Sequence, residues 1–203
     1  APFERTKACD KCPPGTYQND TGALSCRKCE GGHYCAEGAS APLPCPAGSF
    51  SNATDLGAPD ECTACPAGHA CSTGSTEPVP CSPGTLAARE GHGICEKCPA
   101  GEYQCSDAQG YCKVCVAGST TDTGAAAGAS SCTECAAGEY STASNVASCI
   151  MCAAGSITDK GGGTGATTCT ACAVGKYSTA SSLAACIKCD AGRYVESEGS
   201  DKA

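Results

Sequence analysis

One unit of 37 residues stands twice in succession in this sequence, at residues 115–151 and 152–188. The two copies are identical at more than half of their positions, and all their cysteines fall in step. A fixed period of this size is typical of an array of small repeats. Each copy divides into a longer and a shorter half, and each half opens with Cys-x-x-Gly and ends at the first cysteine of a Cys-x-x-Cys pair. We therefore expect the whole chain to be a string of such half-units.

Cysteine has to replace the hydrophobic core of an ordinary domain here. The 203 residues include 23 cysteines and 26 glycines, but no tryptophan and only two phenylalanines. Leucine, isoleucine, valine and phenylalanine together make up about 8% of the chain, well below the ~20% under which chains tend to stay disordered. Burial of apolar side chains cannot offset the entropy of ordering the backbone, about 1–2 kcal/mol per residue. Disulfides or metal ligands are the remaining source of stability.

In eleven half-units, a glycine follows the opening cysteine at the third position. These glycines are Gly15, Gly32, Gly48, Gly68, Gly84, Gly101, Gly118, Gly138, Gly155, Gly175 and Gly192. Glycine adopts positive φ without steric cost, so we expect a sharp turn after each of these cysteines. An aromatic residue usually stands two positions later, where its ring is expected to cover the neighbouring crosslink. No segment has sustained helical periodicity. The sequence thus predicts small disulfide-rich repeats that form an elongated rod of short β-hairpins and loops, with almost no helix and no single hydrophobic core.

The spacing of the cysteines divides the chain into three nominal regions. Residues 1–25 hold an incomplete first repeat. Residues 26–111 hold four-cysteine repeats of the spacing Cys-x2-Cys-x5-Cys-x9-Cys, which occurs twice. Residues 112–203 hold the tandem double repeats, of which the last is incomplete. No flexible linker separates these regions.

Three chemistries use Cys-x-x-Cys pairs, namely disulfides, structural zinc and redox catalysis. The spacing from Cys112 to Cys135 fits a structural zinc site, but the pairs form an unbroken series rather than sets of four. The acceptor sequence Asn-x-Ser/Thr occurs at Asn19 and Asn52, and it has meaning only in the secretory pathway, where disulfides form. We interpret the cysteines as disulfides and expect no cofactor. A multi-zinc protein and redox catalysis, which needs one tuned thiolate, remain the alternatives.

The repeat suggests a sequential pairing, in which the second cysteine of each pair bonds to the first cysteine of the next. The hypothesis gives Cys12–Cys26, Cys45–Cys62, Cys81–Cys95, Cys115–Cys132, Cys135–Cys149, Cys152–Cys169 and Cys172–Cys186, with small rings Cys29–Cys35 and Cys65–Cys71. A crossed ladder within the four-cysteine units, Cys26–Cys35 with Cys29–Cys45, is the main rival, because sequence alone does not fix a pairing.

Five cysteines have no assigned partner in this scheme, namely Cys9, Cys98, Cys105, Cys112 and Cys189. Of these, Cys9, Cys105 and Cys189 are the candidates for bonds to another chain or outside this segment. Cys105 and Cys112 compete for Cys98, and the loser is a candidate for a bond to another chain. Cys9 and Cys189 belong to half-units that lack a mate within the chain. Such half-units complement each other head to tail, either between copies, which would give a filament, or within a longer polypeptide.

The repeat resembles the ephrin-receptor-like cysteine-rich repeat, whose hallmark is Cys-Pro-x-Gly-x-Tyr/Phe before a polar loop and a Cys-x-x-Cys pair. Residues 12–17, 45–50 and 98–103 carry this hallmark. The resemblance extends to the first module of tumour-necrosis-factor-receptor repeats and covers nearly the whole chain. It implies a disulfide-laddered extracellular rod of the kind found in receptor ectodomains and in surface or matrix proteins. From Cys115 onward the proline is replaced by valine or alanine and, after Cys189, by aspartate, so a particular ligand does not carry over.

Several functions are excluded or disfavoured by the sequence. The net charge is −8 and basic residues do not cluster, so nucleic acid is not an expected partner. No apolar run approaches the ~20 residues of a membrane span. The histidines His33, His69 and His92 lie in or beside glycine-rich turns without a recurring catalytic companion, so we expect no enzyme.

Two functions remain. The first is an extracellular structural protein, a glycosylated repeat rod that builds a filament, stalk or surface coat with copies of itself or with other matrix or surface proteins. The second is the ligand-binding ectodomain of a cell-surface receptor, with the ligand on the less regular residues 26–115. Receptor contacts usually use large aromatic or arginine anchors, and the aromatic residues here are committed to the repeat. The sequence favours the structural function at the cell surface or in the extracellular space.

Overall fold

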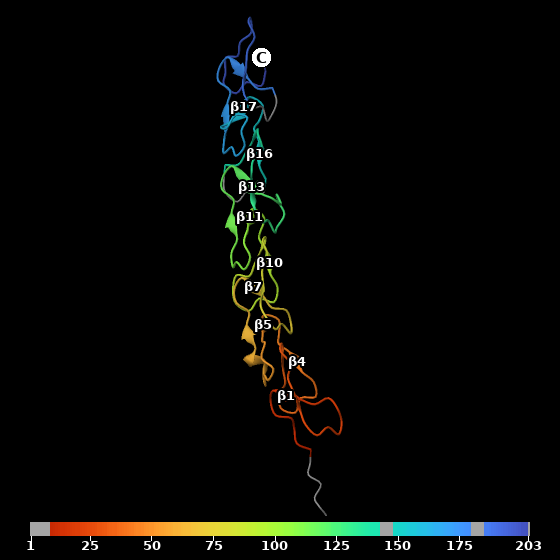
Figure 1. Cartoon of the computed structure of the whole chain (residues 1–203). Helices are drawn as coiled ribbons and strands as arrows, with labels where there is room; N and C mark the ends of the chain where they lie inside the picture. Colours follow the sequence, from red (N-terminus) through yellow and green to blue (C-terminus); the bar gives the residue numbers. More distant parts are fainter. Residues whose placement is uncertain (1–8, 143–147, 180–184, 203) are drawn as a thin grey trace, which may run out of the picture. The chain divides into compact units, whose positions relative to one another are not determined.

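The computed structural model describes residues 9–142, 148–179 and 185–202. The chain divides into two compact units. Unit 1 consists of residues 1–81 and 87–95, and unit 2 consists of residues 82–86 and 96–203. Within the described residues, both units consist of two-stranded antiparallel hairpins joined by turns and loops (Figure 1). The only helical turn there is the 3-10 turn η1 at Pro59–Glu61.

Strands of two or three residues pair with the next strand along the chain in every described sheet. Unit 1 holds β1 (Thr16–Tyr17), β2 (Arg27–Lys28), β3 (His33–Tyr34), β4 (Leu43–Pro44), β5 (Ser49–Phe50), β6 (Thr63–Ala64), β7 (His69–Ala70) and β8 (Val79–Pro80). Unit 2 holds β9 (Thr85–Leu86), β10 (Glu96–Lys97), β11 (Glu102–Tyr103), β12 (Lys113–Val114), β13 (Ser119–Thr121), β14 (Cys132–Glu134), β15 (Glu139–Tyr140), β16 (Ile150–Met151), β17 (Ser156–Thr158), β18 (Cys169–Ala171), β19 (Lys176–Tyr177) and β20 (Ile187–Lys188). The predicted fold class of short hairpins in disulfide-rich repeats is confirmed.

Each repeat begins at the cysteine that precedes a turn glycine by three residues, which we call its opening cysteine. We number the repeats 1 to 11 by Cys12, Cys29, Cys45, Cys65, Cys81, Cys98, Cys115, Cys135, Cys152, Cys172 and Cys189. All eleven turn glycines have positive φ, as the sequence predicts. In repeats 1 to 10 the first strand follows the glycine directly, and the second strand, which we call the closing strand, lies just before the next opening cysteine.

Neighbouring repeats are joined by backbone hydrogen bonds. The turn amide of Gly118 in repeat 7 donates to the carbonyl of Ser141 in repeat 8 at 2.9 Å. The amide of Ser141 donates in turn to the carbonyl of Ala166 in repeat 9 at 3.1 Å, and Tyr140 forms a parallel bridge with the same alanine. Equivalent bonds recur in unit 1, for example from Gly48 to Cys71 at 2.8 Å. The repeats therefore satisfy their backbone groups across junctions and not only within hairpins.

Alternate repeats also touch. A Cβ atom added at Gly118 in repeat 7 would lie 2.5 Å from the carbonyl oxygen of Gly165 in repeat 9. Glycine is required at this position for two reasons, namely the φ of +83° and the close approach of the Gly165 carbonyl. The same contact joins the turn of repeat 2 at Gly32 to the loop of repeat 4 at Gly74 within unit 1. These junctions therefore involve three successive repeats.

Sulfur and small polar groups occupy the interior of the described repeats. Most buried side chains are the opening cysteines of repeats 1 to 10 and residues six positions after an opening cysteine, which we call position +6. Position +6 is filled by Cys35, Ser51, Cys71, Ala87, Gln104, Thr121, Ser141, Thr158 and Ser178 in the repeats where it is buried. The aromatic side chains one residue earlier, such as Tyr103 and Tyr140, are only half-buried. The fold has no single hydrophobic core among the described residues.

Candidate functional site

The crosslinks give each repeat its fixed shape. Eight disulfides join an opening cysteine to the first cysteine of the following pair and close rings with a separation of 14 or 17 residues. They are Cys12–Cys26, Cys45–Cys62, Cys81–Cys95, Cys98–Cys112, Cys115–Cys132, Cys135–Cys149, Cys152–Cys169 and Cys172–Cys186. The structure thus contains the sequential pairs. It also pairs Cys98 with Cys112, whereas the sequence left the partner of Cys98 open.

Repeats 2 and 4 carry their crosslink in a different place. Here the opening cysteine bonds to position +6, in the pairs Cys29–Cys35 and Cys65–Cys71, each with a separation of six residues. The position of the missing hairpin-closing cysteine is taken by Pro42 and Pro78. The crossed ladder is not present. Each opening cysteine from repeat 1 to repeat 10 therefore has one disulfide within its own repeat.

Three free cysteines remain among the described residues. Cys9 and Cys105 are exposed, and Cys189 is half-buried. Cys105 directly follows the buried Gln104, at the seventh position after the opening cysteine, which we call position +7. Gln104 holds this loop in place, since its Oε1 accepts the amide N–H of Ser106 at 3.0 Å and its Nε2 donates to the carbonyl of Tyr111 at 2.6 Å. The loop presents the thiol to solvent.

The acceptor asparagines Asn19 and Asn52 occupy the same position +7 in repeats 1 and 3, and both are exposed. The loop around them has the geometry found at Cys105. Gln18 Oε1 accepts the amide N–H of Asp20 at 2.9 Å, and Ser51 Oγ accepts that of Ala53 at 3.1 Å. Position +7 is therefore an outward-facing site in all three repeats.

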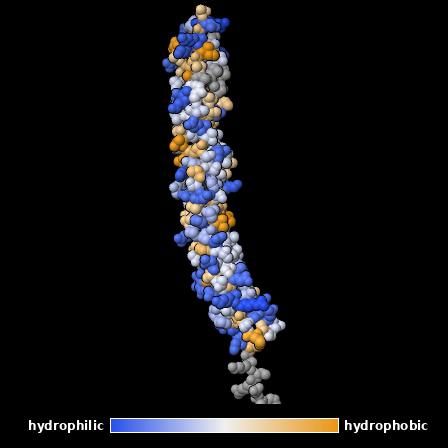
Figure 2. All heavy atoms as spheres, in the orientation of Figure 1, coloured by the Kyte–Doolittle hydropathy of each residue, from blue (hydrophilic) through white to orange (hydrophobic). Residues whose placement is uncertain are grey.

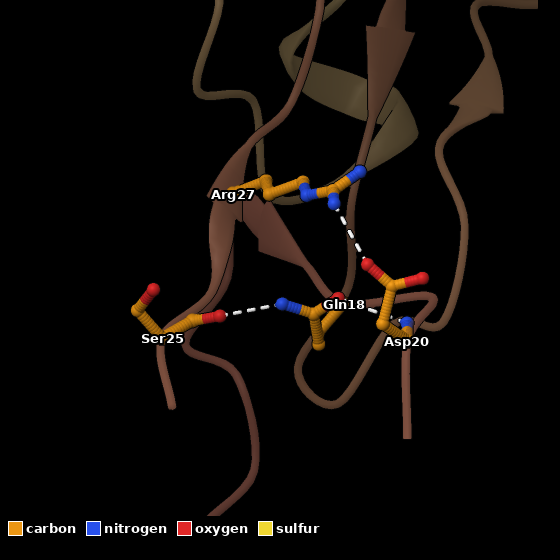
Figure 3. Close-up of polar contacts among 4 residues, drawn as sticks. All are labelled: Gln18, Asp20, Ser25 and Arg27. Carbon is orange, nitrogen blue, oxygen red and sulfur yellow. Dashed lines mark hydrogen bonds and ion pairs between the residues drawn. The ribbon is translucent and has the colours of Figure 1, made fainter. Parts of the chain in front are cut away.

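The two acceptor loops differ in the residue after the asparagine. In repeat 1, Asp20 forms an ion pair with Arg27, with Oδ2 and Nη2 at 2.7 Å (Figure 3). Gln18 Nε2 also donates to the carbonyl of Ser25 at 2.6 Å, so the whole loop is tied to the closing strand (Figure 3). In repeat 3 the same place is taken by Ala53, whose side chain forms no such contact.

Comparison with known proteins agrees with this geometry. Residues 3–41 and 84–132 match the family model of the tyrosine-protein kinase ephrin type A/B receptor-like repeat. The chain is a tandem array of cysteine-rich, receptor-like repeats. The matched residues make up less than half of the chain, and no curated protein matches it. Repeats of this family are non-catalytic extracellular modules. Together with the disulfides, the match indicates an extracellular or cell-surface protein.

The long loops of the array in repeats 7 and 9 are closed by a carboxylate that sequence reasoning missed. Asp122 accepts hydrogen bonds from the hydroxyls of Ser130 and Ser131 at 2.8 and 3.0 Å. Asp159 accepts one from the hydroxyl of Thr167 at 2.8 Å. The Ser130 hydroxyl above all lowers the pKa of the Asp122 carboxyl, and the Thr167 hydroxyl lowers that of Asp159. The signal was available, since both acids follow a threonine at the same step of the 37-residue period.

His33 and His69 occupy the same position in repeats 2 and 4, where ring Nδ1 lies 3.1 and 3.2 Å from a backbone carbonyl of the turn. This contact orients the ring within its own loop. Groups of three side chains that could hold a metal ion do not occur in the described residues. Nor does any helix there have the length and apolar character of a membrane span.

Proposed function

We propose that this chain is an extracellular structural protein, whose repeats associate with copies of the chain to build a filament, stalk or surface coat. The observation that carries the proposal is the uniform junction between repeats. Each repeat contacts its neighbours through main-chain hydrogen bonds and turn contacts, as in the bond from Gly118 to Ser141. An array of this kind can be extended without a new type of contact.

Two exposed thiols support covalent assembly. Cys9 and Cys105 lie on the surface in a chain whose other described cysteines, except Cys189, are all in disulfides. In an oxidising compartment such thiols form bonds between chains. Head-to-tail and lateral contacts would then be locked after they form.

Electron microscopy and sedimentation velocity of the secreted chain test this proposal together. We expect regular fibrils or a concentration-dependent series of oligomers, part of which survives denaturation without reductant and dissolves when reductant is added. Dispersed monomers at every concentration, in the native source material as well, would contradict the structural function.

The proposal includes N-linked glycans at Asn19 and Asn52. Their shared outward position +7 supports both sites, and the small Ala53 leaves the second more accessible than the first, where Asp20 is held by Arg27. We expect peptide N-glycosidase treatment to lower the mass of the secreted chain, with higher occupancy at Asn52. The variants Thr21→Ala and Thr54→Ala should each remove one glycan. An unchanged mass after treatment would contradict this part.

The second candidate function is that of a ligand-binding ectodomain. The observation in its favour is a cleft of about 480 Å³ in repeat 1, lined by Lys11, Gln18 and Leu24 among others. The cleft lies within a stretch that matches the receptor-like family, outside residues 26–115 where the sequence placed a ligand. A chain that stays monomeric and binds a soluble partner, with loss of binding in Leu24→Glu, would favour this function.

A further inference from the structure

The closing strands alternate in character along the chain. In repeats 2, 4, 6, 8 and 10 they expose large apolar side chains, and in repeats 1, 3, 5, 7 and 9 they expose none. The exposed residues are Leu43, Val79, Val114, Ile150, Met151 and Ile187. The even closing strands therefore differ as a class from the odd ones, although all the hairpins have the same fold.

Position +7 alternates in the same step. Five of the six odd repeats carry an acceptor asparagine or an acidic residue there, and the even repeats carry small or hydroxyl residues and one cysteine. The odd residues are Asn19, Asn52, Ala88, Asp122, Asp159 and Glu196, and the even ones are Ala36, Ser72, Cys105, Thr142 and Thr179. At position +7, charged residues and glycan acceptors thus occur in odd repeats, whereas closing strands with exposed apolar side chains occur in even repeats.

Alternate repeats contact each other in space. Within unit 2, the turns of repeats 5, 7 and 9 pack on the loops of repeats 7, 9 and 11, for example Gly155 against Gly199. Odd repeats of unit 2 therefore contact one another, just as the even repeats 2 and 4 do in unit 1. Figure 2 shows exposed apolar residues as separate spots among polar ones, as expected for strands of only two residues.

Charges on two even hairpins of unit 2 complement each other. In β19–β20, Lys176 lies directly opposite Lys188, and both side chains are exposed. Like charges directly opposite across a ladder are unfavourable, and within the described part of the chain neither lysine has a carboxylate within ion-pair distance. In β15–β16, Glu139 lies opposite Met151. One hairpin thus has an excess of positive charge and the other a carboxylate, each beside an exposed isoleucine.

We propose that these two hairpins form a lateral interface with a second copy of this chain. The hairpin β15–β16 of one copy would meet β19–β20 of the other, and the reverse contact would form at the same time. A two-fold axis produces this reciprocal arrangement, because it uses the same surface of both copies. Ile150 would then pack against Ile187 on one face of the hairpins, and Glu139 and Met151, which point to the other face, would meet the opposed lysines Lys176 and Lys188.

This interface gives the lateral contact of the structural function proposed above, and it rests on that function. Two small hairpins bury less area than a stable dimer needs, so a single pair would associate weakly. The same contact repeated between assembled chains becomes strong through multivalency. The glycan acceptors and acidic residues of the odd repeats would stay outside the interface.

A matched pair of surface variants tests the proposal in the full chain. Ile150→Glu with Ile187→Glu places two carboxylates on even closing strands. Thr133→Glu with Thr170→Glu places two at the equivalent strand position of odd repeats 7 and 9. All four side chains are exposed, so both variants should fold. We expect the dissociation constant from sedimentation equilibrium to rise about tenfold or more in the even variant and to change less than about twofold in the odd one.

Carbodiimide crosslinking supplies a second readout. In a mixture of ¹⁴N- and ¹⁵N-labelled copies, we expect a link between Glu139 of one copy and Lys176 or Lys188 of the other. Association that persists in the even variant, or that proceeds without this crosslink, would overturn the interface and leave the structural function intact. A wild-type chain that is monomeric at every concentration would overturn both.

Discussion

Repeats 2 and 4 differ from the eight other crosslinked repeats in where the sulfur bridge lies. In the eight, the bridge joins the opening cysteine to the base of the closing strand, as in Cys135–Cys149. In repeats 2 and 4 it joins the opening cysteine to position +6, as in Cys65–Cys71. The hairpins β3–β4 and β7–β8 nevertheless keep the same two-residue register as β15–β16.

The comparison separates what every repeat needs from what it can replace. The buried opening cysteine, the turn glycine and the junction hydrogen bonds are common to both kinds. The site of the second sulfur is not, because proline at Pro42 and Pro78 stands where the cysteine is missing. A proline reduces the conformational entropy of the unfolded chain, and so does a longer disulfide ring. Both therefore raise the free energy of unfolding in the same way.

Loss of a hairpin-closing bridge should have the largest effect. For Cys135→Ser with Cys149→Ser, we expect repeat 8 to lose about 3 kcal/mol of its free energy of unfolding, from the entropy of a ring of that length. For Cys65→Ser with Cys71→Ser, the smaller ring predicts a loss of about 2 kcal/mol. Native-state amide exchange measures both, because the repeats of an array open locally. Equal losses in the two variants, or a larger loss for the smaller ring, would contradict this difference between the two kinds of repeat.

The turn glycines should respond alike in both kinds of repeat. Gly32→Ala in repeat 2 and Gly118→Ala in repeat 7 would place a Cβ atom 2.3 and 2.5 Å from a backbone oxygen. Each should cost about 2 kcal/mol or more through positive φ and overpacking. Gly175 has a φ of +79° but nothing within 4 Å, so Gly175→Ala is the control and should cost about 1 kcal/mol. Equal losses at all three sites would contradict the stacked turns.

Substitution at position +6 should lower the free energy of unfolding by less where this position holds a hydroxyl than where it holds a disulfide sulfur. Thr158 is 2% exposed, and its Oγ1 donates to the carbonyl of Gly161 at 2.7 Å. Thr158→Val keeps the shape but removes this bond, which should cost about 1 kcal/mol. Thr158→Ser keeps the bond and is the matched control. Amide exchange in repeat 9 would distinguish the two variants. A larger loss of stability in the serine variant would show that the volume of the side chain, and not its hydrogen bond, stabilises the repeat.

Acid should loosen the long loops of repeats 7 and 9 and leave repeats 2 and 4 unchanged. The pKa of Asp122 lies below its ordinary value of 3.8 because Ser130 and Ser131 donate to its carboxylate. The carboxylate therefore stabilises the loop above about pH 4, and this contribution disappears as the pH falls through the lowered pKa. The amide shift of Ser130 between pH 6 and 2 follows the change. In Asp122→Asn this shift should be independent of pH over that range.

The sequence contained the repeat, the turns and the class of fold because these depend on spacing alone. Cys-x-x-Gly places the turn, and the next Cys-x-x-Cys places the closing strand. The role of position +6 could not be predicted in the same way. Sequence reasoning assigned the interior to the aromatic residue, such as Tyr140, whereas the structure buries Ser141 beside it. Which of two adjacent residues faces inward depends on contacts with the next repeat, here the bond from Ser141 to Ala166.

The partner of Cys98 needed the structure for a similar reason. Cys105 and Cys112 are both within reach along the chain, and only the hairpin β11–β12 brings Cys112 to the opening cysteine. Cys105 lies instead on the outward position +7. The acceptor asparagines were found from their sequence motif, but their common place in the repeat appeared only when the loops were compared.

Peptide mapping of the secreted chain under non-reducing conditions tests the central claim most directly. That claim is that every opening cysteine from repeat 1 to repeat 10 bonds within its own repeat. We expect linked peptides for Cys135–Cys149, Cys98–Cys112 and Cys29–Cys35, with Cys105 either free or joined to another chain. A bond between Cys132 and Cys149, a bond between Cys29 and Cys45, or a majority of free thiols would contradict it.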